Sequence, residues 1–301
     1  MISLLYGEND FELKKHVKKI VSEFADANTT EKVDGNRLSV DDLPNLLSGM
    51  SLFSQNRLVI LYDTSANKEV WDKLADYIES DNSDTRLVLV ESSPDKRTRT
   101  FKQLQKRADS MQFNNLNENE AKTWLLNEAK ASNVDLTAAL AEKVVARAGV
   151  DQWKLHFALQ KLANADEINE QSINEQIEAS VQANVFALID AALQRSPQKV
   201  HKLVGEASSS EDPYFFFGLF SSQMFQLVTL AVSDKKPAEV AADLGVHPYP
   251  MQKLSSIARQ LNSSDLKKIA LIVAGCDDQI KRSGAEPWLL IEQALVKIAS
   301  R

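Results

Sequence analysis

Cysteine, glycine and proline are all scarce in this chain of 301 residues. The single cysteine, Cys276, excludes an internal disulfide framework and a structural zinc site built from cysteines, because each needs at least two thiols. Nine glycines and eight prolines are less than half the usual share, which favours helices. The composition is otherwise that of a globular protein, with 44% hydrophobic and 26% charged residues. The length predicts roughly two domains, or three if one is small.

The N-terminus does not read as a signal peptide, and the sequence has no uninterrupted hydrophobic run of membrane length. Its N-terminus has neither a cationic region nor a small-residue cleavage site. The longest apolar stretch, 214–232, is interrupted by Ser221, Ser222, Gln223 and Gln226 before the roughly 20 residues that a membrane span needs. We therefore expect a cytoplasmic protein without membrane contact.

Basic residues are fewer than acidic ones, 35 Lys and Arg against 42 Asp and Glu, so the formal net charge is -7. A protein that wraps nucleic acid unaided needs clustered Lys and Arg to contact phosphates. The charge argues against such a protein. It leaves open a subunit whose partners supply the positive charge.

A phosphate-binding loop is missing where one would sit, after the first predicted strand. Gly7 is followed by Glu8 and Asp10, which place carboxylates where phosphates need hydrogen-bond donors. A Walker A motif also needs a Lys and a Ser or Thr. Asp63 closes a later predicted strand, but Thr64 follows it, so the acidic pair of an ATPase is missing as well. We expect no nucleotide hydrolysis by this chain.

Metal-ligand and nucleophile motifs are missing too. There is no HExxH spacing and no GxSxG nucleophile elbow. Cys276 lies in an apolar helical stripe, which indicates a buried, inert thiol. The histidines are interpreted as surface or hydrogen-bonded residues: His16, His156, His201 and His247. We therefore expect no intrinsic catalysis, no metal and no cofactor.

Residues 1–115 alternate short apolar runs with amphipathic helical stretches, the pattern of a mainly parallel α/β sheet. A helix is predicted after Gly7, because Leu13, Val17, Ile20 and Phe24 share one helical face. Strands are predicted at 2–6, 58–62 and 86–90, with weaker edge strands near 32–33 and 111–113.

Beyond Phe113 the strand signals stop and the sequence reads as helix. Asn117 with Glu120 resembles a capping box, Thr137 can cap the next helix, and Gly149 can end it in the left-handed conformation. We predict an α/β domain over 1–115, a small helical domain over 116–180 and a helical domain of about five further helices over 181–301.

Two segments are candidates for binding. In the first, Met50, Leu52 and Phe53 precede a buried strand. These side chains either close the end of the core or form an exposed apolar wedge, which usually marks a partner site. The second, 237–256, has a small residue four positions before Gly245 and resembles a helix-turn-helix, although any tight helix pair needs such residues.

A basic run precedes and enters a predicted helix of the first domain. We interpret it as a solvated face, not as a set of DNA contacts. Its residues are Lys96, Arg97, Arg99, Lys102, Lys106 and Arg107.

Several separate stretches together resemble the delta subunit family of the bacterial DNA polymerase III clamp loader, over essentially the whole chain. The opening run 4–11 is similar to the family's first strand and its glycine turn, and Met50–Phe53 followed by Arg57 is similar to its clamp-contacting loop. The other stretches that carry the resemblance are 95–98, 149–151 with 159–162, 245–249, Ala258 and Arg259, Asp277 and Asp278, Ile280 and Lys281, Gly284 and Pro287.

The resemblance implies a degenerate AAA+ fold: a RecA-like domain without a P-loop, a small helical lid domain and a C-terminal helical collar domain. It implies a subunit that binds the beta sliding clamp through Leu52 and Phe53, supported by Met50, and opens it without hydrolysing ATP. The implied partners are the tau/gamma and delta-prime subunits, and primed DNA through the assembled complex. Such a subunit is classed with DNA-directed DNA polymerase because of its complex. Ser283 departs from family members with an aromatic residue near this position, so base stacking is not expected there.

Two other functions compete with this interpretation. A stand-alone DNA-binding regulator using 237–256 predicts sequence-specific binding with a strong salt dependence, against which the acidic charge argues. A nucleotide-dependent enzyme predicts saturable ATP turnover, against which the missing lysine and magnesium ligands argue.

Overall fold

The computed structural model describes residues 1–24, 30–48, 57–79, 85–246 and 248–301. The chain divides into two compact units. The first contains residues 1–117 and takes in 151–153, and the second contains 118–150 and 154–301. Each unit is described by itself.

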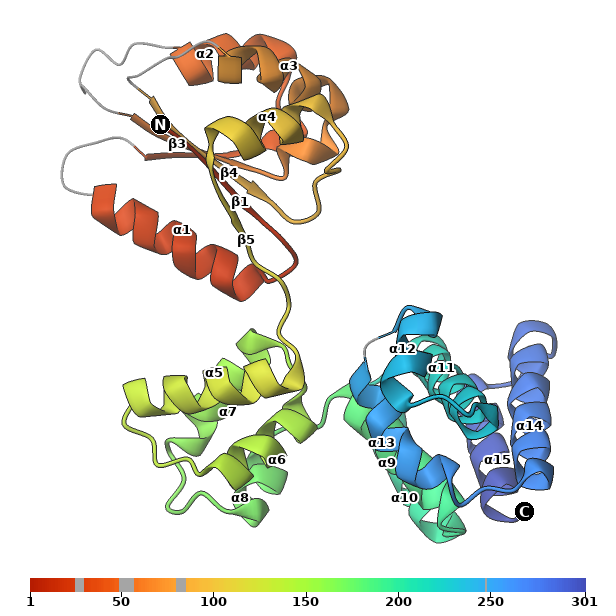
Figure 1. Cartoon of the computed structure of the whole chain (residues 1–301). Helices are drawn as coiled ribbons and strands as arrows, with labels where there is room; N and C mark the ends of the chain where they lie inside the picture. The colour runs from red at the N-terminus through yellow and green to blue at the C-terminus, as the bar shows by residue number, and fades with distance from the viewer. Residues whose placement is uncertain (25–29, 49–56, 80–84, 247) are drawn as a thin grey trace. The chain divides into compact units, whose positions relative to one another are not determined.

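A parallel sheet of five strands forms the centre of the first unit (Figure 1). The spatial order is β2-β3-β4-β1-β5, and every neighbouring pair is parallel. All five predicted strands are confirmed, the three apolar ones in the buried middle and the two weaker ones at the edges. Their bounds are β1 Ile2–Tyr6, β2 Thr30–Asp34, β3 Arg57–Tyr62, β4 Thr85–Glu91 and β5 Asp109–Gln112.

Helices cover both faces of this sheet, as a continuously apolar parallel sheet requires. Figure 1 shows α1 (Asp10–Phe24) on one face, with α2 (Leu43–Ser48), α3 (Lys68–Glu79) and α4 (Arg99–Arg107) on the other. Alternate strand residues separate the two cores. Leu5, Ile60 and Val88 pack with α1, whereas Leu4, Leu61 and Leu89 pack with the other helices around Trp71. Short 3-10 turns occur at Gly35–Arg37 (η1), Val40–Asp42 (η2) and Thr64–Ala66 (η3).

The described part of the second unit has no strand and contains eleven helices, α7 beginning at Gln152 in the first unit. From Val181 onward seven helices follow, where the sequence predicted about five. One reason is that α12, with eight residues, is too short to give a clear apolar period. The bounds are α5 Glu118–Ala131, α6 Ala138–Ala148, α7 Gln152–Leu162, α8 Glu170–Gln176, α9 Val181–Leu193, α10 Pro197–Ser208, α11 Pro213–Val232, α12 Pro237–Leu244, α13 Pro248–Ala258, α14 Ser263–Arg282 and α15 Pro287–Ala299.

Helix α6 begins after Thr137 and ends at Gly149, the two residues that the sequence predicted as its caps. The Thr137 hydroxyl accepts a hydrogen bond from the Leu140 amide, which confirms the N-cap. Gly149 ends the helix with φ 85° and ψ -166°. The positive φ was expected, but ψ lies outside the left-handed helical region, in a conformation open almost only to glycine.

The apolar helix α11 packs against α9, α12, α13, α14 and α15 of the C-terminal bundle. Among the described residues it is the one helix long and apolar enough to cross a membrane by length and composition. Its Phe216, Phe220 and Leu227 are fully buried in the bundle core, together with residues of the other six helices. The bundle core therefore accounts for one part of the hydrophobicity of α11, whereas Tyr214, Phe215, Phe225 and Val232 of the same helix are exposed.

Candidate functional site

The predicted binding residues Met50, Leu52 and Phe53 fall in 49–56, outside the described residues. The structure therefore does not test whether they close the core or form a wedge. What it describes are the two flanking elements, α2 and β3. Helix α2 ends at Ser48 and strand β3 begins at Arg57. The side chain of Arg57 contacts both α2 and β2.

Two backbone segments approach each other closely at the turn after β1. Gly7 has φ 133°, and a Cβ at this position would lie 2.0 Å from the carbonyl oxygen of Phe113. Its amide donates to the Glu91 carbonyl at 3.0 Å. The glycine is therefore needed for packing against the end of β5, and its amide already has a partner.

The start of α1 is occupied by side chains where a P-loop protein would hold phosphate. Asn9 caps the helix, because its Oδ1 accepts from the Glu12 amide at 3.1 Å. Asn9 Nδ2 donates to Gln152 Oε1 at 2.6 Å, and Gln152 Nε2 donates to Glu12 Oε1 at 2.8 Å. These three residues form a closed ring of hydrogen bonds in which Asn9 and Gln152 are buried.

Trp153 extends this contact along α1. Its indole Nε1 donates to Asp10 Oδ2 at 3.0 Å, and its ring meets the edge of Phe11 with centroids 4.8 Å apart. Lys14 Nζ lies 5.5 Å from the Trp153 ring centroid and forms an ion pair with Asp10. Residues 151–153 are thus an integral part of the first unit, although they follow its main segment by more than 30 positions.

A buried carboxylate lies at the end of β4. Glu91 is 0% exposed, and its two oxygens accept from the amides of Thr64 and Ser65, each at 3.0 Å. Burial is the main cause that raises the pKa of Glu91 to about 7, opposed by these hydrogen bonds and assisted by the negative charge of Asp63. Asp63 itself accepts from Ser92, with φ 49°. The two carboxylates therefore hold the loops after β3 and β4 together.

A cavity of about 320 Å³ opens beside the Gly7 turn. One lysine, Lys96, lines it, with Nζ 5.2 Å from the Tyr6 ring centroid and 3.4 Å from Gln112 Oε1. Glu8 lines it as well and accepts from Asn115 at 3.3 Å. These lining groups pair with one another, Lys96 with Gln112 and the Tyr6 ring and Glu8 with Asn115, and the turn does not have the glycine-rich sequence of a triphosphate-binding loop.

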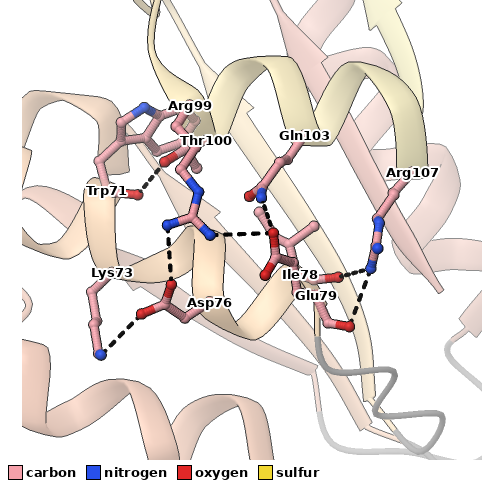
Figure 2. A network of polar contacts seen from close by, with 9 residues as sticks. All are labelled: Trp71, Lys73, Asp76, Ile78, Glu79, Arg99, Thr100, Gln103 and Arg107. Atoms are coloured by element: carbon pink, nitrogen blue, oxygen red, sulfur yellow. Dashed lines mark hydrogen bonds and ion pairs between the residues drawn. The ribbon is translucent and has the colours of Figure 1, made fainter.

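The basic run around α4 is used mostly within the first unit (Figure 2). Arg99 forms ion pairs with Asp76 and Glu79 of α3, and Arg107 donates to the Ile78 and Glu79 carbonyls at the end of that helix. Arg97 pairs with Asp95 and lowers the pKa of that carboxyl to about 2. The interpretation as a solvated face is refined, since two of the six cations, Arg99 and Arg107, join α4 to α3.

The helix-turn-helix-like segment packs into the bundle. Gly245 adopts the left-handed conformation between α12 and α13, as a tight turn requires. Val240, Ala241, Met251 and Leu254 are buried in the α9–α15 core. Charged residues of α12 include the acidic Glu239 and Asp243, which do not suit a phosphate contact.

Cys276 is buried on α14, and burial raises the pKa of its thiol to about 11. The prediction that this thiol is buried is therefore confirmed. Among the described residues no group of three His, Cys, Asp or Glu could hold a metal ion.

Two family models match the chain, one at each end. The model described as DNA polymerase III, delta subunit, matches residues 4–114, and a second model, for the C-terminal domain of the same family, matches 182–298. This chain belongs to the DNA polymerase III delta subunit family. Delta is part of a polymerase complex. The first match spans β1 to β5 and the second spans α9 to α15.

Two relatives extend the match over the whole length of the delta subunit. DNA polymerase III subunit delta of Bacillus subtilis is 24% identical over 320 residues, covering 99% of this chain and 92% of the relative. The solved structure of the Bacillus subtilis DNA clamp loader delta protein (YqeN) has 22% identity and a TM-score of 0.63, covering 100% of this chain and 95% of that one. The predicted fold class is confirmed in its parallel α/β and all-α parts, and the chain shares the fold of this solved delta protein.

Sequence reasoning missed two polar clusters in this delta chain. Glu91 had a local signal, because a carboxylate ends the apolar run of β4 directly before two serines. The partnership of Asn9 with Gln152 had none, since 143 positions separate these residues. The family resemblance included the run 4–11, which contains Asn9, but gave neither cluster a role.

Proposed function

We propose that this chain is the clamp-opening delta subunit of its clamp loader. In this proposal Leu52 and Phe53, supported by Met50, insert into a hydrophobic pocket on the beta sliding clamp. Burial of the Leu52 and Phe53 side chains would contribute roughly 1.5 to 3 kcal/mol each. The observation that carries the proposal is family membership at both ends of the chain, with the loop sequence of the family between α2 and β3.

The proposed mechanism is mechanical. Binding can shift the clamp from closed to open only by the difference in affinity for the two states. The delta subunit therefore has to contact the open clamp more favourably than the closed one. ATP hydrolysis is assigned to other subunits of the loader, which is supported by the carboxylates of the Gly7 turn and by the side-chain ring at the start of α1.

The proposal also assigns the parts of the chain. Residues 1–115 are the clamp-binding domain, 116–180 the lid, and 181–301 the collar that joins the tau/gamma and delta-prime subunits. Primed DNA would pass through the assembled complex in the cytoplasm, where phosphates are contacted without reading sequence. The family match over 182–298 supports a separate C-terminal domain.

Binding to the sliding clamp of the same organism, measured by surface plasmon resonance, tests the proposal. The double variant Leu52→Asp/Phe53→Asp should lose binding while its circular dichroism stays that of the wild type. Val232→Asp/Leu271→Asp is the matched control, because it adds the same charges at apolar residues that are 70% and 64% exposed on the second unit. We expect this control to bind like the wild type.

The outcomes separate the candidate functions. If the wild type does not bind the clamp, the clamp-opening proposal fails, and the isolated chain should next be tested for sequence-specific DNA binding with a strong salt dependence. Equal binding by all three proteins would keep the partner but move the site away from Leu52 and Phe53. Saturable ATP turnover by the purified chain would contradict the assignment of hydrolysis to other subunits.

A further inference from the structure

An exposed apolar stripe runs along α11 in the C-terminal bundle. The helix has no charged residue over its 20 positions. Its Tyr214, Phe225 and Val232 are 61%, 62% and 70% exposed. These residues belong to a stripe in which exposed or half-buried positions recur at steps of four and three, the spacing of a helix face that another helix covers. The stripe consists of Tyr214, Gly218, Ser221, Phe225, Val228 and Val232.

A second stripe runs along the neighbouring helix α14. Figure 1 shows α14 at the outer side of the C-terminal bundle. The exposed residues of this stripe are Lys267, Leu271, Ala274 and Asp278, at steps of four, three and four. Leu271 is 64% exposed, and Asp278 pairs with Arg282 of the same helix, where both remain exposed. The α14 stripe thus has an apolar middle, a basic residue at one end and an acidic residue at the other.

A groove of about 290 Å³ lies between the two helices at the middle of both stripes. Its lining comes from Ser221, Met224, Phe225 and Val228 of α11 and from Ile269, Ala270, Val273, Ala274 and Asp277 of α14. These residues span about two turns of each helix, so the helices run side by side here. We call the two stripes with this groove the α11–α14 face.

The order of residues on α14 matches a second copy of the same helix in antiparallel orientation. Its spacing reads the same in both directions. A twofold axis through the middle of the face, perpendicular to the helix, sets Lys267 opposite Asp278 of the second copy. The same axis sets Leu271 opposite Ala274 of the second copy. Opposite charges therefore meet at both ends, and a large side chain meets a small one in the middle.

The α11 stripe has the same symmetry about the same place. Its steps are four, three, four, three and four, with the midpoint between Ser221 and Phe225. Both of these residues line the groove beside the middle of the α14 stripe, so one axis serves both helices. It sets Phe225 opposite Ser221 of the second copy and Val228 opposite Gly218. Large side chains again face small ones, as close packing of two identical surfaces requires.

We propose that the α11–α14 face binds a second copy of this chain in an antiparallel, twofold-symmetric dimer. Two helices of 20 residues, each about 30 Å long and about 10 Å wide, offer roughly 600 Å² per copy. This area is at the lower limit of stable interfaces, so the dimer is weak and reversible. The inference goes beyond the proposed function, because it concerns the isolated chain and a surface of the second unit.

Sedimentation equilibrium of the purified chain measures the dimer Kd. Phe225→Ala removes the largest aromatic side chain in the middle of the face, and we expect the Kd to rise about tenfold. Since Phe225 is mostly exposed in the single chain, the circular dichroism should stay that of the wild type. Phe157→Ala is the matched control, at a phenylalanine of α7 that is 53% exposed. It should dimerise like the wild type.

Charge reversal tests the antiparallel arrangement. Lys267→Glu sets two carboxylates against each other at both ends of the dimer, and Asp278→Lys sets two ammonium groups against each other. Each variant alone should dimerise about tenfold more weakly. In an equimolar mixture opposite charges face each other again at both ends, so the Kd should return to within about twofold of the wild type. Lys202→Glu, at a lysine of α10 that is 77% exposed, is the matched control and should not change the Kd.

Three results would overturn the inference. The first is a wild-type chain that stays monomeric up to about 200 μM. The second is a Phe225→Ala Kd equal to that of the wild type. The third is a mixture of the two charge variants that associates no better than either variant alone.

The dimer and clamp binding can fail separately. Clamp binding is assigned to the first unit, so Val232→Asp/Leu271→Asp should be monomeric and still bind the clamp. A wild-type chain that dimerises without binding the clamp would overturn the proposed function and leave this inference in place. A monomeric wild-type chain that binds the clamp would do the reverse.

Discussion

Each unit contains a pair of buried amide side chains, Asn9 with Gln152 in the first and Gln223 with Gln226 in the second, and the two pairs differ in their hydrogen bonding. Asn9 and Gln152 are 5% and 4% exposed, and the oxygen and nitrogen of each amide have partners. Gln223 and Gln226 of α11 are each 5% exposed, and the oxygens of both amides have no hydrogen-bond partner among the described residues. Because an enclosed polar atom without a partner loses its hydration without replacement, removal of the amide should have opposite effects in the two places.

Asn9→Ala should produce the largest effect. It removes the N-cap of α1 and leaves Gln152 Oε1 enclosed without its donor, so we expect the free energy of unfolding of the first unit to fall by about 3 kcal/mol. Native-state hydrogen exchange of the slowest β4 amides measures this quantity locally. Asn164→Ala, at an exposed asparagine bonded only to the Gln160 carbonyl, is the control and should change little. A fall below about 1 kcal/mol would mean that the ring is not a stabilising unit.

Glu91 tests the same principle with a carboxylate. A folded-state pKa raised from 4.5 to about 7 means that the folded state binds the proton more tightly than the unfolded state. The contribution of Glu91 to the free energy of unfolding is therefore highest below pH 4.5 and is lost as the pH rises through 7. Between pH 5.5 and 8 we expect the first unit to lose about 2 kcal/mol.

The matched variant for this pH dependence is Glu91→Gln, which cannot ionise. Exchange of the β4 amides at the two pH values should show a difference of about 2 kcal/mol between wild type and variant. Parallel pH profiles for the two proteins would show that Glu91 does not carry the effect.

Gln223→Met should stabilise the second unit. Methionine has nearly the same shape, and the enclosed amide oxygen without a partner is removed, so the free energy of unfolding should rise by about 1 kcal/mol. Gln226→Met should gain less, because the Gln226 amide nitrogen donates to Ser222 Oγ at 3.2 Å. Exchange of the slowest α11 amides gives both values. Destabilisation by Gln223→Met would indicate that the amide is needed in the folded bundle.

The elements of the fold were predictable because they depend on local periodicity. The runs that became β1, β3 and β4 are apolar throughout, as strands covered on both faces must be. The α1 helix repeats apolar residues at its own period, and Thr137 lies where an N-cap is required. In each of these cases a short stretch of sequence contains the whole physical reason.

The polar clusters were not predictable for the converse reason. The partner of Asn9 is Gln152, and those of Glu91 are backbone amides after another strand. No local period reveals a hydrogen bond across such a separation. The proposed clamp-binding residues came from family resemblance, since the residue pattern left the choice between a core closure and a wedge open.

Substitution of the α4 arginines should change stability least. Arg107 contacts backbone carbonyls at the end of α3, whereas Arg99 pairs with exposed carboxylates, so the two variants compare these kinds of contact. Arg107 donates to the Ile78 and Glu79 carbonyls at 3.2 and 3.1 Å, so Arg107→Gln should lower the stability of the first unit by about 0.5 to 1 kcal/mol. Arg99 has a side chain 61% exposed and pairs with two carboxylates in solvent, so Arg99→Gln should leave β4 exchange unchanged. Salt would screen an Arg99 effect but not the loss of the Arg107 hydrogen bonds. If both variants lower the stability of the first unit equally, the positive charge of the arginines stabilises it, and not the hydrogen bonds to the Ile78 and Glu79 carbonyls.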